Sequence, residues 1–351
     1  MGTVYTSSNF LYKPNLIPME KAIAVVVSYN RQQLLSECIT ALRNQTQKLD
    51  AILVINNGST DNTEQWLLEQ PDVFFVTQKN VGSGGGFNTG ISWAFNHGYS
   101  WIWCMDDDGY PKEDALEKIL AVETDHLCLR NCAVINKEDK KSFVWKTKNF
   151  QNIDEVNTNL IYGIGHPFNG TMIHRNIVER VGLPKPSLFL WGDESEYYQR
   201  ITRRNNIPVC TVSSSIHYHP ASAFSYKEDW NFTSSWKMYF YIRNRLHIHN
   251  AKFNNKLFAF VNYFCFLIAV CGIVTIYQKT DRFKKLTFLF WPAIDAFSND
   301  FSQSPQTILQ RLNQSNSQKA IMRIQNYMRY TRQTLATLFS VPQPGEQTAN
   351  A

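Results

Sequence analysis

The feature that most constrains the fold of this 351-residue chain is a regular alternation of apolar runs with amphipathic stretches, which begins at residue 22. Ala22–Ser28 (AIAVVVS) is a continuous, valine-rich run, typical of a parallel strand that is covered on both faces. The same pattern predicts strands at 51–55, 73–77 and 99–105 and helices at 34–43, 61–69 and 86–96. Strands and helices in alternation predict an α/β fold with a mostly parallel, doubly wound sheet.

Polar loops follow three of the predicted strands. Ligands of a doubly wound sheet collect at the carboxyl ends of its strands, so these loops are the candidate binding site. The side chains that follow the first two strands are Ser28, Tyr29, Asn30, Arg31, Asn56 and Asn57. The strand at 99–105 is followed by three adjacent aspartates, Asp106, Asp107 and Asp108.

The aspartate triplet predicts a divalent cation. Adjacent carboxylates at the end of a buried strand repel one another unless a cation lies among them. In extended backbone, residues two apart point the same way, so Asp106 and Asp108 are expected to face one ion. Oxygen ligands of this kind suit Mg²⁺ or Mn²⁺, which can also bridge the oxygens of a diphosphate. The alternative is an acidic turn before a helix that begins at Pro111.

Residues 80–90 (NVGSGGGFNTG) form a glycine cluster that leads into an apolar helix. Such a loop allows backbone amides to approach a diphosphate or a sugar at a helix N-terminus, which makes Asn80, Gly85 and Gly86 candidate donor ligands. The cluster matches neither the dinucleotide-binding fingerprint nor the Lys-Ser/Thr ending of a P-loop. A turn without a ligand is the alternative.

A second acidic cluster lies at 188–200 (LFLWGDESEYYQR), where an apolar run leads into a predicted helix. Asp193 lies at the start of that helix, where free amides would hold it ionised and able to accept a proton from a sugar hydroxyl. Glu196 lies one turn further on the same face, and favourable helix-dipole charge is the alternative role for both acids. After a predicted strand at 209–216 come His217 and His219, which could complete a metal shell or form an ordinary surface pair.

Taken together, these motifs resemble glycosyltransferase family 2 over residues 21–250. The matching pieces occur in the family's order: AVVVSYNR, LVINNGSTDNT, NVGSGGGFNTG, WIWCMDDDG, Asn169-Gly170-Thr171, LFLWGDESEYYQR, IHYHP and YIRNRL. The resemblance implies a single GT-A type nucleotide-sugar-binding domain with a mostly parallel sheet, followed by a helical C-terminal region. The combination of DDDG, WGDESEY and RNR is similar to the galactofuranosyltransferase and rhamnosyltransferase branch.

The resemblance also implies a role for each candidate residue. Asp193 matches the catalytic base, and the metal ligands match Asp106, Asp108 and His217, with His217 preferred over His219. The nucleotide and donor residues match Ser28, Tyr29, Asn30, Arg31, Asn56, Asn57, Asn80, Gly85, Gly86 and Asp107. The acceptor residues match Trp191, Glu194, Glu196 and His219.

Two positions depart from the family pattern. Asn56 stands where an aspartate is usual, although an asparagine oxygen can still accept from the N3 hydrogen of uracil or thymine. Glu194 stands where relatives often have aspartate, which weakens the acceptor assignments.

The implied reaction is inverting transfer of a sugar to a bacterial surface polysaccharide or a lipid-linked glycan, with UDP-galactofuranose as the expected donor. dTDP-rhamnose is the alternative donor. A sugar nucleotidyltransferase, or a glycan-binding subunit without activity, is the alternative from another class.

The C-terminal third is expected to be helical over 251–335. The apolar run at 257–277 is flanked by lysines and arginines, and it could lie in the membrane interface, span the bilayer or pack in a helical bundle or homo-oligomer. A leader at 1–20 and a disordered tail at 336–351 are also predicted.

Composition narrows the location and the partners. Seven cysteines without a CxxC pair are expected to be reduced thiols, and no export signal is apparent, which favours the cytoplasm and the inner face of a bacterial plasma membrane. The net charge of +6 is scattered, which permits contact with phosphates or an anionic membrane, and no nucleic-acid partner is expected.

Overall fold

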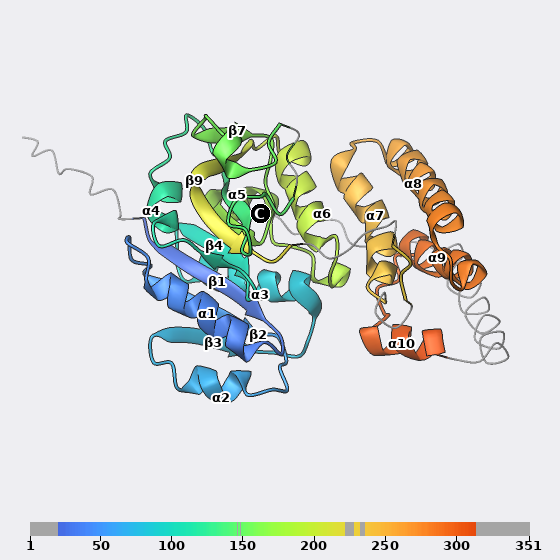
Figure 1. Cartoon of the computed structure of the whole chain (residues 1–351), viewed down its shortest axis with the longest axis horizontal. Helices are drawn as coiled ribbons and strands as arrows, with labels where there is room; N and C mark the ends of the chain where they lie inside the picture. Colours follow the sequence, from blue (N-terminus) through green and yellow to red (C-terminus); the bar gives the residue numbers. More distant parts are fainter. Residues whose placement is uncertain (1–19, 146, 148, 222–227, 232–235, 314–351) are drawn as a thin grey trace, which may run out of the picture. The chain divides into compact units, whose positions relative to one another are not determined.

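The computed structural model describes residues 20–145, 147, 149–221, 228–231 and 236–313 (Figure 1). The predicted tail and, apart from Glu20, the predicted leader lie outside the described residues. The chain divides into two compact units, Met1–Ser225 with Phe240–Val270, and Tyr226–Tyr239 with Cys271–Ala351.

The first unit is built on a nine-stranded sheet in the order β3-β2-β1-β4-β8-β6-β9-β5, with β7 paired to β9. Its strands are β1 Ala22–Ser28, β2 Ala51–Asn56, β3 Val73–Thr77, β4 Trp101–Asp106, β5 Tyr110–Pro111, β6 Leu129–Asn136, β7 Leu160–Tyr162, β8 Asn169–His174 and β9 Val209–His219. The ladders β1–β2, β1–β4, β2–β3 and β6–β9 are parallel, and the ladders made by β5, β7 and β8 are antiparallel. The predicted α/β fold is confirmed.

Helices cover both faces of this sheet. They are α1 Gln32–Arg43, α2 Thr63–Leu68, α3 Gly82–Asn96, α4 Ala115–Leu120, α5 Arg175–Val181 and α6 Asp193–Gln199, with short helical turns η1 Ile153–Glu155, η2 Pro186–Leu188 and η3 Arg200–Arg204. One core cluster packs alternate residues of β1 and β2 against α1 and α4, and a second packs the other residues of the same strands against α3, α5 and α6. Every residue of β1 and β2 is buried, as the continuous apolar runs predict.

Helix α3 begins at Gly82, four residues before the predicted start at residue 86. This part of the helix lies so close to β1 that only glycine, which has no Cβ atom, fits at two positions facing the strand. A Cβ atom on Gly86 would lie 2.5 Å from Val27 Cγ1, and one on Gly90 would lie 2.3 Å from Val25 Cγ1. The glycine cluster is therefore a closely packed first turn rather than a loop.

The described part of the C-terminal region is helical, with α7 Met238–Lys252, α8 Lys256–Tyr277, α9 Arg282–Phe297 and α10 Pro305–Asn313. Residues 314–335 of the predicted helical region lie outside the described residues. Within the second unit, the buried Lys285 ammonium contacts Asp229 Oδ1 at 2.6 Å and Gln278 Oε1 at 2.9 Å, which satisfies its charge.

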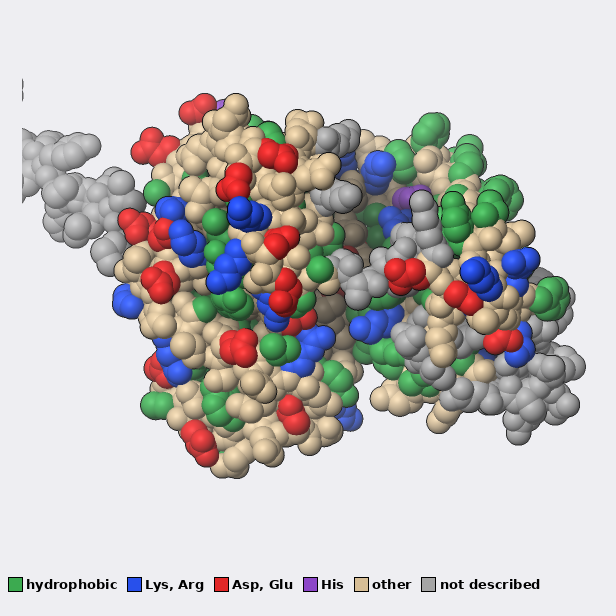
Figure 2. Space-filling model, viewed as in Figure 1, with side chains coloured by type: hydrophobic (Ala, Val, Ile, Leu, Met, Phe, Trp, Pro, Cys, Tyr) green, Lys and Arg blue, Asp and Glu red, His purple; other side chains and the backbone are tan. Residues whose placement is uncertain are grey.

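Helix α8 carries an exposed apolar surface. Of the described helices, it alone is long and apolar enough to cross a membrane, by length and composition. Its exposed side chains include Leu257, Phe258, Phe260, Val261, Phe264, Ile268 and Ile276, and Figure 2 shows apolar side chains gathered over this helix. An apolar surface of this kind favours contact with a membrane or a protein.

Replacing a helical glycine by alanine should have opposite effects on stability in α3, which packs closely on β1, and in α8, which has open space at its glycine. Gly90→Ala should lower the free energy of unfolding by about 1–3 kcal/mol, because the new methyl group meets the stiff Val25 side chain. Gly272→Ala in α8 is the matched control, since no heavy atom of the described residues, apart from the backbone of its own helix, lies within 4 Å of its Cβ position. This variant should stabilise the protein by up to about 1 kcal/mol. Urea unfolding followed by circular dichroism measures both. A Gly90→Ala variant as stable as the parent would contradict this account of the packing.

Candidate active site

The carboxyl ends of β1 and β4 bring the first polar loop to the aspartate triplet. The parallel register places Val27 beside Asp106. Ser28 Oγ donates to Asp107 Oδ2 at 2.7 Å. Arg31 Nη1 donates to Asp107 Oδ1 at 3.1 Å and to Asp108 Oδ2 at 2.7 Å. Two loops that are about 75 residues apart in sequence thus form one charged site, as the sheet topology predicts.

The three aspartates differ in protonation behaviour because their surroundings differ. Burial, followed by the charges of Asp108 and Asp107, raises the pKa of Asp106 well above its ordinary value. Burial also raises the pKa of Asp107 to about 6, against the opposing effects of Arg31 and Ser28. Burial would raise the pKa of Asp108 as well, but contacts with His219 and Arg31 outweigh it and lower that pKa to about 2. The triplet therefore carries more negative charge than the single arginine, Arg31, can neutralise.

Of the two candidate histidines, His219 is the one that contacts the triplet. His219 Nε2 lies 3.4 Å from Asp108 Oδ1. His217 is fully buried, and neither of its ring nitrogens has a hydrogen-bond partner among the described residues. Burial lowers the pKa of His217 to about 3, so its ring is neutral near neutral pH. A Cβ atom on Gly109 would lie 2.4 Å from His217 Nε2, which shows that the backbone packs directly against this ring.

The donor chemistry at this edge fits a divalent cation, although no ready-made site is present. Among the residues that the structure describes, no group of three or more His, Cys, Asp or Glu side chains is placed to hold a metal ion. However, Asp108 Oδ1 is buried and accepts no hydrogen bond from the described part of the chain. Burial and then the charges of Asp108 and Asp107 raise the pKa of Asp106, and a cation would relieve the repulsion among these carboxylates.

The predicted donor asparagines hold the loops in place. Asn56 is fully buried: its Nδ2 donates to Thr77 Oγ1 at 3.2 Å, and its Oδ1 accepts from the Ser59 amide at 3.1 Å. Asn57 Nδ2 donates to the Gly82 carbonyl at 3.0 Å, and Asn80 Oδ1 accepts from the Gly82 amide at 2.9 Å. These amides are engaged within the protein, so the predicted contact of Asn56 with a nucleotide base remains a prediction that the geometry does not favour.

The other predicted donor residues are placed differently. Tyr29 is 44% exposed, and Asn30 Oδ1 accepts from the Thr60 amide at 2.6 Å. Gly85 and Gly86 lie in the packed first turn of α3, against Val81 and Val27 respectively. Of this group, Tyr29 is the side chain that is free to stack on a ligand.

Asp193, the predicted base, is almost fully buried at the start of α6. Its Oδ2 accepts from Ser83 Oγ of α3 at 2.8 Å, and its Oδ1 has no hydrogen-bond partner among the described residues. Burial and the charge of Glu194 raise the pKa of Asp193 well above its ordinary value. We expected helix amides to hold this carboxylate ionised, but burial outweighs that effect. Ser83 was not among the predicted residues, although it lies within the glycine cluster.

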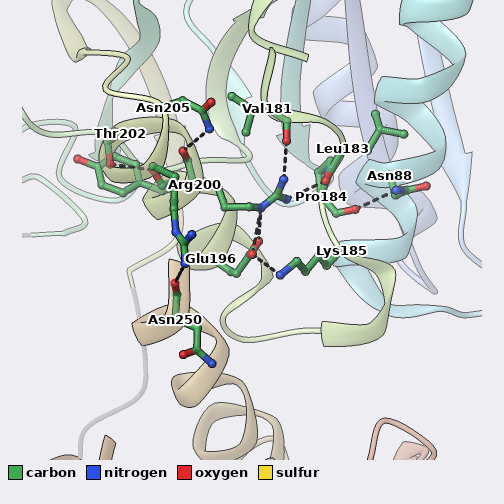
Figure 3. Close-up of polar contacts among 12 residues, drawn as sticks. Asn88, Val181, Leu183, Pro184, Lys185, Glu196, Arg200, Thr202, Asn205 and Asn250 are labelled. Atoms are coloured by element: carbon green, nitrogen blue, oxygen red, sulfur yellow. Dashed lines mark hydrogen bonds and ion pairs between the residues drawn. The ribbon is translucent and has the colours of Figure 1, made fainter. Parts of the chain in front are cut away.

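The buried Glu196 carboxylate is the centre of an ionic network (Figure 3). Arg200 Nε lies 2.9 and 3.0 Å from its two oxygens, and Lys185 Nζ lies 2.7 Å from Oε1. Arg200 also donates to the carbonyls of Val181 and Leu183. Because the carboxylate is fully buried and occupied, this geometry supports a structural role, and acceptor binding by Glu196 stays a prediction.

Two of the remaining predicted acceptor residues, Trp191 and Glu194, flank Asp193 in the sequence. The Glu194 carboxylate accepts from the Gly192 amide at 3.1 Å. Trp191 is partly exposed and lies edge-on to Tyr241, with the ring centroids 6.5 Å apart. The ring centroid of Trp145, a residue that the sequence motifs do not include, lies 5.3 Å from that of His219.

Comparison with known proteins identifies the domain. The model of the family "Glycosyl transferase family 2" matches residues 23–181. The galactofuranosyltransferase GlfT1 of Mycolicibacterium smegmatis is 28% identical over 223 residues, which are 59% of this chain and 74% of that protein. The low-salt glycan biosynthesis hexosyltransferase Agl10 of Haloferax volcanii is 23% identical over 245 residues, 66% of this chain and 76% of that protein.

A solved structure gives a weaker match. The mannosyltransferase PcManGT from Pyrobaculum calidifontis, in complex with GDP-Man and Mn²⁺, has a TM-score of 0.46 at 15% identity, covering 80% of this chain and 87% of that one. The family match and the observed sheet confirm a GT-A type α/β domain. Residues 23–181 therefore match a glycosyltransferase family 2 domain, and this match together with the similarity to GlfT1 supports hexosyltransferase activity.

Proposed function

We propose that this protein transfers galactofuranose from UDP-galactofuranose to a glycan acceptor with inversion at the anomeric carbon. The proposal depends mainly on a pair of acidic sites. One is the aspartate triplet, whose negative charge exceeds the positive charge of Arg31; the other is Asp193, which is buried and has one carboxylate oxygen without a hydrogen bond among the described residues. The similarity to GlfT1 supports galactofuranose as the sugar.

Asp106, Asp108 and His219 would hold a Mn²⁺ or Mg²⁺ ion in this proposal. The contact of His219 with Asp108 supports His219 in place of His217. A bound divalent ion would supply positive charge against the departing diphosphate. Arg31 and Ser28 hold the Asp107 carboxylate in place, where it would contact the bound donor.

Asp193 would act as the general base. Its free Oδ1 would take the proton of the acceptor hydroxyl while that oxygen attacks the anomeric carbon on the side opposite the diphosphate. The bond between the sugar and the diphosphate breaks as the new glycosidic bond forms, and the nucleoside diphosphate leaves with the bonding electrons. The raised pKa suits this role, since a base titrating closer to neutral pH is a stronger proton acceptor.

The exposed apolar face of α8 supports a lipid-linked acceptor at a membrane surface. Side chains such as Leu257 (69% exposed) and Ile276 (72% exposed) would bury in the interface. This arrangement would place the enzyme as a peripheral protein on the cytoplasmic face of the plasma membrane.

Replacing the proposed base gives the first test of this function. Asp193→Asn should lower kcat by about 10²–10⁴-fold, because the amide cannot take the acceptor proton. The assay is release of UDP from UDP-galactofuranose with octyl glycosides as acceptors. In the parent protein, kcat/KM should fall as the pH is lowered, because protonated Asp193 is inactive. The midpoint of that fall should lie well above the ordinary pKa of aspartate. Transfer by Asp193→Asn at a rate near that of the parent would rule out this base.

The two histidines give a second test. His219→Ala should weaken Mn²⁺ binding about tenfold or more in the presence of UDP, because it removes the imidazole beside Asp108. His217→Ala is the matched control, and it should leave Mn²⁺ affinity nearly unchanged while lowering thermal stability through the cavity it creates. Electron paramagnetic resonance of free Mn²⁺ measures the affinity. The opposite pattern would reinstate His217 as the ligand.

A further inference from the structure

The loop that carries the proposed base has an unusual backbone. Between η2 and α6, Phe189 has φ +67°, Trp191 has φ +54° and Gly192 has φ +129°. For residues other than glycine, left-handed conformations of this kind cost roughly 1–3 kcal/mol each and persist only where surrounding contacts enforce them. The loop 188–192 therefore needs neighbours that hold it.

Asn244 of α7 provides the main contacts on one side. It is fully buried, and its Nδ2 donates to the carbonyls of Leu188 at 2.8 Å, Leu190 at 2.9 Å and Trp191 at 3.3 Å. Its Oδ1 accepts from Arg243 Nε at 3.0 Å, which fixes the orientation of the amide. One side chain thus satisfies three carbonyls of the loop.

Arg243 extends the same contact, since its Nη2 donates to the carbonyls of Ser187 at 3.1 Å and Leu188 at 3.0 Å. Both residues come from the YIRNRL motif, to which the proposed reaction gives no chemical role.

Helix α3 holds the loop from its other side. The Gly84 amide donates to the Phe189 carbonyl at 3.0 Å, and Ser83 Oγ donates to Asp193 Oδ2 at 2.8 Å. A Cβ atom on Gly192 would lie 3.0 Å from Asn244 Cβ, so the loop has little room to shift toward α7. The residue after Gly192 is Asp193, and its position is therefore set by these two helices.

We propose that Asn244 is a positioning residue that holds the loop 188–192 and thereby keeps Asp193 buried and aimed for proton transfer. The proposal rests on the proposed function, because it assumes that Asp193, which Asn244 positions, is the catalytic base. Asn244 touches no reacting atom. Its effect should therefore appear in kcat and in the pH profile rather than in donor binding, since a displacement of about 1 Å can cost about 10²-fold in rate.

Asn244→Asp is the sharpest variant, because it keeps the shape of the side chain and replaces the donor with an oxygen that faces three carbonyls. We expect kcat to fall about 10–100-fold, with the dissociation constant of UDP within about twofold of the parent value. The acid limb of the kcat/KM profile should move to lower pH, because a loosened loop admits water to Asp193.

Among the described residues, the titratable group that faces Asp193 is Glu194, which lies on the same helix. Helix α3 presents Ser83 to Asp193, and α7 presents Asn244 and Arg243 to the loop.

Asn262→Asp in α8 is the matched control, because Asn262 Nδ2 donates to one helical carbonyl, that of Phe258, and makes no hydrogen bond to this loop among the described residues. It should leave kcat and the pH profile unchanged. If Asn244→Asp does not fold by circular dichroism, Asn244→Ser, which keeps a shorter donor, should give the same pattern with a smaller loss.

The proposal is overturned if a folded Asn244 variant keeps the kcat and acid limb of the parent, if it loses only thermal stability, or if the Asn262 control loses kcat equally. The Asp193→Asn variant separates this result from failure of the proposed function. If Asp193→Asn retains activity, the base assignment fails whatever Asn244 does; if it is inactive while folded Asn244 variants are normal, only the positioning role fails.

Discussion

Strand β1 is buried on both of its faces, and the position of the whole candidate site depends on that burial. Alternate side chains of the strand pack under α1 and under α3, so the strand can neither slide nor rotate without losing both cores. Ser28 lies at the carboxyl end of β1, and the aspartates follow at the end of the neighbouring strand β4, which pairs with β1 in a fixed register. The closeness of α3, which glycines at positions 86 and 90 permit, also brings Ser83 to Asp193. One packing constraint thus sets both acidic sites.

The two acidic sites use one residue type for different purposes. Asp108 is held ionised because Arg31 and His219 surround it. Asp193 resists ionisation because it is buried beside another acid with one hydroxyl donor. Environment, rather than residue type, separates the proposed ligand from the proposed base, as in other enzymes that use several carboxylates.

Much of this could be predicted from the sequence, and the failures share a cause. The continuous apolar runs located β1 to β4 within about two residues, and the parallel topology brought Arg31 to Asp107 and Asp108. The direction of the pKa shift of Asp193 could not be predicted, because its burial depends on α3, about 110 residues earlier in the chain. The preference for His217 over His219 as a metal ligand stays a prediction, and it had little support in the sequence, since residues two apart on a strand share a face and their difference in burial and in contact with Asp108 appears only in the fold. Of the partners of Glu196, Arg200 follows the local i,i+4 spacing of a helix, whereas Lys185 comes from a separate segment and follows no local pattern.

We propose that the aspartate triplet binds a nucleoside diphosphate together with a divalent ion. Calorimetric titration of the full chain with UDP and with dTDP, each with Mn²⁺ and with excess chelator, tests this proposal most directly. We expect UDP to bind only with Mn²⁺ and more tightly than dTDP. A preference for dTDP would contradict the galactofuranose assignment, and the absence of metal-dependent binding of either nucleotide would contradict the site itself.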